Sequence, residues 1–175
     1  MDATAHYRNL VGLGRAEFLA SAAPAALVRY QLGRGDLASG ATTLTLDQDA
    51  AETVEQTMPH GKDFGVADDT NFVVYPLAKK PGASFPDRIT IGRTPNNDIV
   101  IVEHSVSRFH AYLRFDGKEW VVADAGSKNG SWLGSATLEP RKERKLTSKA
   151  VMRIGDVDLT FYLAPDLYAA LGGSR

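Results

Sequence analysis

The sequence contains no cysteine. This absence excludes a disulfide-stabilised scaffold, a zinc site built on thiolates and a thiol nucleophile, and it fits a reducing compartment. No stretch approaches the roughly 18 apolar residues of a membrane-spanning helix, and the N-terminus lacks the basic and apolar regions of a secretion signal. We therefore expect a cytoplasmic protein with no membrane partner.

The sequence also lacks an excess of charge of either sign. Twenty Lys and Arg residues stand against 21 Asp and Glu residues, giving a net charge of −1. This balance argues against a nucleic-acid partner, because such binding draws on a broadly basic surface. The histidines are scattered, and His110 has no carboxylate at a metal-site spacing, so we expect neither a metal nor a cofactor.

The residues that are present describe a globular chain. Its 175 residues, 43% of them hydrophobic and 23% charged, suffice for a domain of about 100 residues and an appendage. Residues 16–32 favour helix, broken near Pro24 into two short helices. Residues 37–65 are mostly small and polar, with one possible alternating run at 42–46. We expect residues 1–65 to form a partly helical extension of unassigned function.

Beyond residue 70 the pattern changes to short runs of β-branched and aromatic residues. The turn signals Asp116-Gly117 and Gly155-Asp156 predict hairpins. Many short strands without helical periodicity indicate an all-β sandwich or barrel over residues 70–165. Residues 166–175 should form a short C-terminal helix and a tail. The predicted strands are 72–77, 88–92, 98–102, 110–115, 119–123, 131–133, 150–154 and 157–163.

Three loops between these strands carry residues suited to binding an anion. Cations and neutral hydrogen-bonding groups, gathered at one end of a sandwich, would match a phosphate dianion. The cations are Arg93, Arg108 and Lys128, and the neutral groups are Ser107, Ser127 and Asn129.

The order of these motifs resembles that of the forkhead-associated (FHA) domain family. The motifs are Gly92-Arg93, Asn97-Asp98-Ile99, the Ser-x-x-His-Ala of 107–111 and the Asp-x-x-Ser-x-Asn-Gly of 124–130. The resemblance covers roughly residues 71–163. It implies an eleven-stranded β-sandwich that binds a phosphothreonine segment of a Ser/Thr-phosphorylated protein.

The resemblance also implies a role for each residue. Arg93 and Ser107 would contact the phosphate, while Asn129 would bond the backbone of the phosphopeptide. Arg108 and Lys128 lie at variable family positions and can add phosphate contacts. His110, Gly92 and Gly130 would support the binding loops. The chain departs from the common family pattern at Ser131, where threonine is frequent.

Other interpretations of the same residues stay open. Arg93, Arg108 and Lys128 could be ordinary solvated cations, and Asn129-Gly130 would also suit a hairpin turn without function. The sandwich could serve as a phosphate-independent interaction or assembly domain. An enzyme with its active site before residue 71 is disfavoured, because that segment has no nucleophile–base pair, phosphate loop or metal cluster. We therefore expect a binding module and no catalytic residue.

Overall fold

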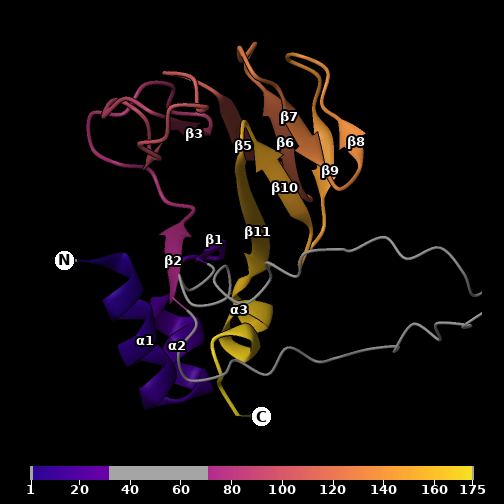
Figure 1. Cartoon of the computed structure of the whole chain (residues 1–175). Coiled ribbons are helices and arrows are strands. Elements are labelled where there is room, and N and C mark those ends of the chain that lie inside the picture. The colour runs from indigo at the N-terminus through magenta and orange to yellow at the C-terminus, as the bar shows by residue number, and fades with distance from the viewer. Residues whose placement is uncertain (1, 32–70, 175) are drawn as a thin grey trace, which may run out of the picture.

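The computed structural model describes residues 2–31 and 71–174, which contain eleven strands and three helices (Figure 1). The helices are α1 (Ala3–Leu13), α2 (Arg15–Ser21) and α3 (Ala164–Ala170). The strands are β1 (Ala25–Gln31), β2 (Asn71–Pro76), β3 (Ile89–Gly92), β4 (Ile99–Val100), β5 (Ala111–Phe115), β6 (Trp120–Asp124), β7 (Ser131–Leu133), β8 (Ala136–Thr137), β9 (Arg144–Leu146), β10 (Val151–Ile154) and β11 (Val157–Leu163).

The strands form a two-sheet sandwich, so the predicted all-β fold is confirmed. One sheet has the order β2-β1-β11-β10-β7-β8, and the other has the order β4-β3-β5-β6-β9. All strand pairs within the sheets are antiparallel except β3 with β4, which run parallel from Ile91 opposite Ile99. The number of strands described equals the eleven that the family resemblance implies.

Alternation along the strands places the core between the sheets. In β11, Val157, Leu159 and Phe161 are buried while the residues between them are more exposed, which is the period-two pattern of a half-buried strand. These side chains meet Ile91 and Leu113 of the opposite sheet in one continuous apolar cluster. That core holds the loops at the ends of the sandwich in place.

Strand β1 corrects the prediction for residues 16–32. The first part is helical, as α2, but Ala25–Gln31 is a strand between β2 and β11. Both of its faces are apolar, because Ala25 and Leu27 enter the sandwich core while Ala26 and Val28 face a second apolar cluster. A strand buried on both faces lacks alternation, and periodicity alone cannot distinguish it from a helix.

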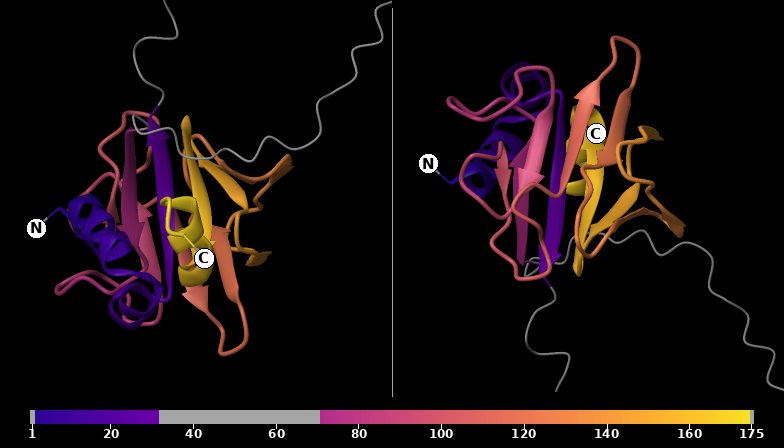
Figure 2. Two further views of the ribbon diagram at one scale, coloured as in Figure 1. Left: turned by 90° about the horizontal axis from the view of Figure 1, so that it is seen from below. Right: turned by 90° about the horizontal axis from the view of Figure 1, so that it is seen from above.

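The second cluster joins the helices to the outer face of the six-stranded sheet. Phe18 of α2 is fully buried, with its ring centroid 5.8 Å from Tyr7 and 5.3 Å from Tyr168. Phe72 and Val74 of β2 complete this cluster from the sheet. Figure 1 shows the three helices gathered on the same side of the molecule, and both views of Figure 2 show β1 lying along β11. The first two helices therefore pack on the outer face of the six-stranded sheet.

The remaining sequence predictions have mixed outcomes. The hairpins at Asp116-Gly117 and Gly155-Asp156 are confirmed, joining β5 to β6 and β10 to β11. Asn129-Gly130 is not a hairpin turn, because β6 and β7 belong to different sheets. The short C-terminal helix is confirmed as α3. The small and polar segment 37–65, with its possible alternating run at 42–46, lies outside the described residues. Among the helices described, none is long and apolar enough to cross a membrane.

We predict that Phe18→Ala will destabilise the whole protein. Emptying a fully buried aromatic site typically costs about 3–5 kcal/mol, and the loss should lower a single unfolding transition if helices and sandwich unfold together. Urea denaturation followed by far-ultraviolet circular dichroism measures this. Leu19→Ala is the matched control, because Leu19 is exposed in the same helix and should cost under about 1 kcal/mol. Two separate transitions would contradict a shared folding unit.

Candidate phosphopeptide site

Three loops meet at one end of the sandwich and enclose a cleft of 840 Å³. They connect β3 to β4, β4 to β5 and β6 to β7. All five residues predicted to contact a phosphopeptide line this cleft, although 36 positions separate the first from the last. The lining residues are Arg93, Thr94, Asn96, His104, Ser105, Val106, Ser107, Arg108, Phe109, Gly126, Lys128 and Asn129.

The charge of the cleft is positive, in contrast to the chain as a whole. Arg93, Arg108 and Lys128 contribute three cations, and the lining contains no aspartate or glutamate. Within the residues that the structure describes, no ion pair engages any of these three side chains. The cleft therefore offers uncompensated positive charge to an anion, without a carboxylate to compete with it.

The neutral residues of the cleft are held by backbone contacts. The Ser107 hydroxyl oxygen accepts a hydrogen bond from the Lys128 backbone N–H at 3.0 Å, which leaves the hydroxyl proton available to a ligand. Asn129 donates from its side-chain amide to the Ser105 carbonyl oxygen at 2.8 Å. Its remaining amide proton and its amide oxygen can still pair with a peptide backbone.

His110 connects two of the loops from below the cleft. The Ser107 backbone N–H donates to Nδ1 at 2.9 Å, so the proton of the neutral ring lies on Nε2, which donates to the Gly130 carbonyl oxygen at 2.9 Å. The ring is fully buried. Burial lowers the pKa of His110 against the opposing effects of the Gly130 carbonyl and Asp124. The imidazole is therefore neutral near pH 7 and acts as a spacer between the loops.

Asp124, at the end of β6, organises the loop that carries Lys128 and Asn129. Its carboxylate accepts from the backbone N–H groups of Gly126 and Ser127 at 2.8 and 2.9 Å, and from the hydroxyls of Ser127 and Ser131. Burial raises the pKa of Asp124, but these hydrogen bonds outweigh burial and hold the pKa below its usual value. Ser131, the one departure from the common family pattern, thus supplies a buried hydroxyl to this network.

Two glycines fit the backbone roles that the resemblance implies. A Cβ on Gly92 would overlap the Arg108 carbonyl oxygen, so the end of β3, which Arg93 follows, can approach the β4–β5 loop only without a side chain there. The Arg93 N–H then donates to the Ser107 carbonyl oxygen at 2.9 Å. Gly130 has φ of +85°, a left-handed conformation that glycine adopts at little cost.

Several cleft residues escaped the sequence-based prediction. Ser105 links three segments, since its carbonyl accepts from Asn129 and its hydroxyl accepts from the Asp156 backbone N–H at 3.0 Å. Phe109 and His104 also line the cleft. Phe109 occupies an unspecified position of the motif at 107–111, and His104 precedes that motif, so neither had a signal of its own. Within the described residues, no group of three or more His, Asp or Glu side chains is placed to bind a metal.

Comparison with known proteins agrees with this geometry. The model of the FHA domain matches residues 89–155, which hold all five predicted contact residues. This part of the chain is an FHA domain. Its matched segment begins at β3, so strands β1, β2 and β11 of the sandwich lie outside the match.

The chain is also similar in sequence to curated proteins over part of its length. The chain is 37% identical over 76 residues to an oxoglutarate dehydrogenase inhibitor from Corynebacterium efficiens, covering 43% of this chain and 51% of the relative. It is 36% identical over 74 residues to the glycogen accumulation regulator GarA from Mycolicibacterium smegmatis, covering 42% and 45%. The chain thus spans about half the length of the curated relatives it matches.

Solved FHA structures are among the structural matches. Mycobacterium tuberculosis EmbR, in complex with a low-affinity phosphopeptide, aligns with a TM-score of 0.44 and 31% identity over 51% of this chain and 21% of EmbR. The N-terminal FHA domain of Rad53p from S. cerevisiae, in complex with a phosphothreonine peptide, aligns with a TM-score of 0.43 and 19% identity over 55% and 89%.

The lowered pKa of His110 predicts that stability falls on mild acidification. The unfolded chain has the ordinary histidine pKa of about 6.5 and takes up a proton there, whereas the folded ring resists protonation until lower pH. The free energy of unfolding should therefore decrease as the pH falls below about 6.5, by at most about 1.4 kcal/mol per pH unit from this group.

Urea titrations between pH 7.5 and 5.5 measure this decrease. His110→Gln should be less stable at pH 7.5, because removing a buried partner costs about 1–3 kcal/mol, and it should lose less stability over the same range. The other histidines are common to both proteins and cancel in the comparison. Parallel curves for the wild type and the variant would show that His110 titrates normally in the fold.

Proposed function

We propose that the cleft binds a phosphothreonine-containing segment of a Ser/Thr-phosphorylated protein, so that the chain mediates a phosphorylation-dependent interaction. The observation that carries the proposal is the convergence of Arg93, Ser107 and Asn129, with two further cations, in one cleft without a carboxylate. In this proposal the FHA domain is a binding module that acts in cytoplasmic kinase signalling and catalyses no reaction.

The charge of a phosphorylated residue explains why several cations would gather here. A phosphate monoester carries about −1.5 to −2 charges near pH 7, more than one arginine neutralises. Arg93 is half-buried beside the Ser107 backbone, where it can present its planar guanidinium to two phosphate oxygens. Arg108 and Lys128 are exposed at the rim and would add weaker, screened attraction.

The neutral hydrogen-bonding groups would add directed contacts, which charge alone does not provide. The Ser107 hydroxyl proton is directed by the bond that its oxygen accepts, and it would donate to a phosphate oxygen. Asn129 would pair with the peptide backbone near the residue after the phosphothreonine, fixing the direction of the chain. His110, Gly92 and Gly130 would hold these groups in register without touching the ligand.

A peptide screen tests the proposal. A degenerate library with a fixed phosphothreonine, applied to the purified full chain, should select a subset of sequences, while the matched unphosphorylated library should select none. Equal selection from both libraries would favour the alternative, a phosphate-independent interaction domain. Selection from neither would count against a peptide-binding role for this cleft.

Arg93 should be the most sensitive single position. Because lysine cannot copy the bidentate contact of a guanidinium, Arg93→Lys should weaken phosphopeptide binding nearly as much as Arg93→Ala, by about 2–3 kcal/mol. Titration calorimetry with one selected phosphopeptide measures both. Arg144→Lys is the matched control, because Arg144 is an exposed arginine of β9 outside the cleft. Wild-type affinity for Arg93→Lys would disprove bidentate contact.

The rim cations should contribute through long-range charge. Arg108→Ala and Lys128→Ala should each weaken binding by under about 1 kcal/mol at low salt and reduce the salt dependence of affinity, because exposed charges are screened. Neither variant should change the melting temperature. Binding curves at low and high ionic strength separate this effect from unfolding. A variant that matches the wild type at low salt would show that its side chain does not contribute.

A further inference from the structure

The loop between β2 and β3, residues 77–88, places an exposed aromatic ring beside the candidate cleft. Phe85 is 47% exposed, and its ring stacks on that of Phe109, with 5.4 Å between centroids and 23° between planes. Phe109 lines the cleft. The two rings therefore extend one wall of the cleft with apolar surface, next to the residues proposed to bind phosphate.

The backbone at Phe85 is held in a conformation that its side chain does not favour. Its φ is +61°, in the left-handed region that bulky residues rarely adopt. Such conformations persist only where the surrounding structure enforces them, and they gather at functional sites.

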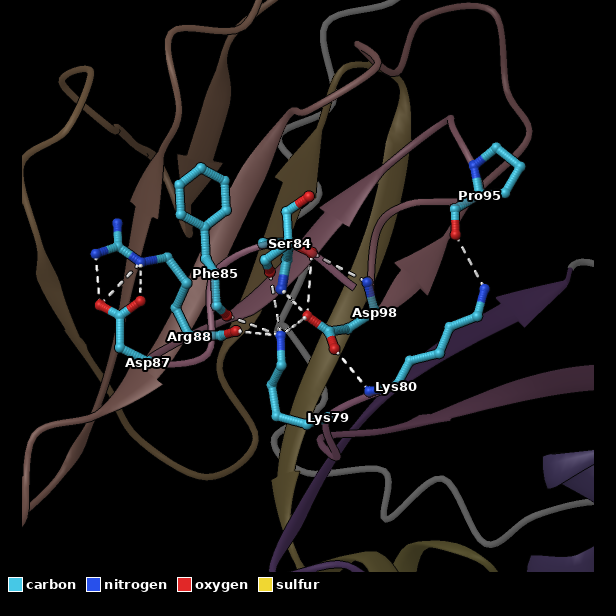
Figure 3. A network of polar contacts seen from close by, with 9 residues as sticks. Lys79, Lys80, Ser84, Phe85, Asp87, Arg88, Pro95 and Asp98 are labelled. Atoms are coloured by element: carbon cyan, nitrogen blue, oxygen red, sulfur yellow. Dashed lines mark hydrogen bonds and ion pairs between the residues drawn. The ribbon is translucent and has the colours of Figure 1, made fainter. Parts of the chain in front are cut away.

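Lys79 enforces this conformation. Its ammonium group donates to the carbonyl oxygens of Ser84, Phe85 and Arg88 at 3.2, 2.8 and 3.1 Å, and to the Asp98 carboxylate at 2.8 Å. Figure 3 shows these acceptors around the ammonium group and the Phe85 ring pointing away from it. The Asp98 side chain is fully buried, so this anchor is fixed in the fold.

The same loop is tied to the loop that carries Arg93. The Ser84 N–H donates to the Asn96 carbonyl oxygen at 3.3 Å, and the Lys80 ammonium donates to the Pro95 carbonyl oxygen at 3.0 Å. On the other side, the Arg88 guanidinium lies 5.5 Å from the Phe85 ring centroid. Phe85 is thus fixed relative to the cleft instead of being free to collapse onto other apolar surface.

We propose that Phe85 and Phe109 form an apolar subsite that selects a hydrophobic side chain of the bound phosphopeptide. This inference rests on the proposed function of the cleft. Phe109 lies two residues after Ser107 and lines the same cleft, so a side chain of an extended peptide bound there can reach the ring pair within a few residues of the phosphothreonine. An aliphatic or aromatic side chain there would cover ring surface that is otherwise exposed to water.

The test compares phosphothreonine peptides in which one leucine replaces alanine at each position, up to about five residues on either side. For the wild type, leucine at one position should tighten binding about five- to tenfold, as expected for partial burial of its side chain. Phe85→Asn should reduce that ratio to about twofold or less. It should bind the all-alanine phosphopeptide with wild-type affinity, because the phosphate contacts are intact.

Asparagine is chosen because it tolerates the left-handed conformation, so the variant should fold with an unchanged or higher melting temperature. Phe85→Tyr should restore the leucine preference. Phe115→Asn is the matched control, since Phe115 is an equally exposed phenylalanine that packs on Trp120 outside the cleft, and it should keep the full ratio.

The outcomes separate the two proposals. Tight binding of phosphothreonine peptides with no leucine preference at any position, or a preference that Phe85→Asn retains, would overturn the subsite and leave the proposed function standing. Failure of the wild type to distinguish phosphorylated from unphosphorylated peptides would overturn the proposed function, and the subsite with it.

Discussion

The candidate site depends on one buried imidazole. His110 accepts from the Ser107 backbone and donates to the Gly130 carbonyl, and so it spans the two loops that supply Ser107 and Asn129. A ring that both donates and accepts must be neutral, and its burial keeps it so near pH 7. Together with the bonds from the Lys128 N–H to the Ser107 hydroxyl and from the Asn129 amide to the Ser105 carbonyl, the ring fixes the distance between a hydroxyl and an amide that lie 22 positions apart.

Below the cleft, polar groups are fully paired, while the cleft itself presents unpaired charge. Asp124, Asn97 and His110 are buried, and each has hydrogen-bonding partners within the described residues. Arg93, Arg108 and Lys128, by contrast, face the cleft without a carboxylate nearby. The buried groups beneath the cleft are all hydrogen-bonded, and the three cations that line it are unpaired within the part of the chain that the structure describes. The cleft can therefore bind a charged group without large rearrangement.

The sequence motifs named residues that line one cleft in the structure, whereas the edges of the fold were predicted less well. Gly92-Arg93 and the motif at 107–111 have a fixed order along the chain, and the hydrogen bonds that bring them together are made largely by residues within the motifs. Strand β1 was missed because Ala25–Gln31 is apolar on both faces and follows a helical segment. Tertiary pairing with β11, which is remote in sequence, decided its conformation.

Other features depend on contacts that have no local signature. The sequence around Lys79 and Phe85 does not indicate that one ammonium group would donate to three carbonyl oxygens, or that a phenylalanine would adopt a positive φ. Asn-Gly is a common hairpin turn, so the hairpin interpretation of Asn129-Gly130 agreed with local preference, but the flanking strands belong to different sheets. Sequence patterns report local preference, and here the arrangement of the two sheets overrode it.

The pairing of β1 with β11 also bears on how the chain folds during synthesis. Ala25–Gln31 leaves the ribosome well before one of its two neighbours in the sheet, which begins only at Val157. At a synthesis rate of about 5–20 residues per second, that edge of an apolar strand waits on the order of ten seconds for its partner. The six-stranded sheet can therefore close only after β11 has been made, and an unpaired apolar strand edge invites pairing with other chains in the meantime. The helices α1 and α2 precede β1 in the chain and pack against its outer face, so they are positioned to shield that face until β11 is made.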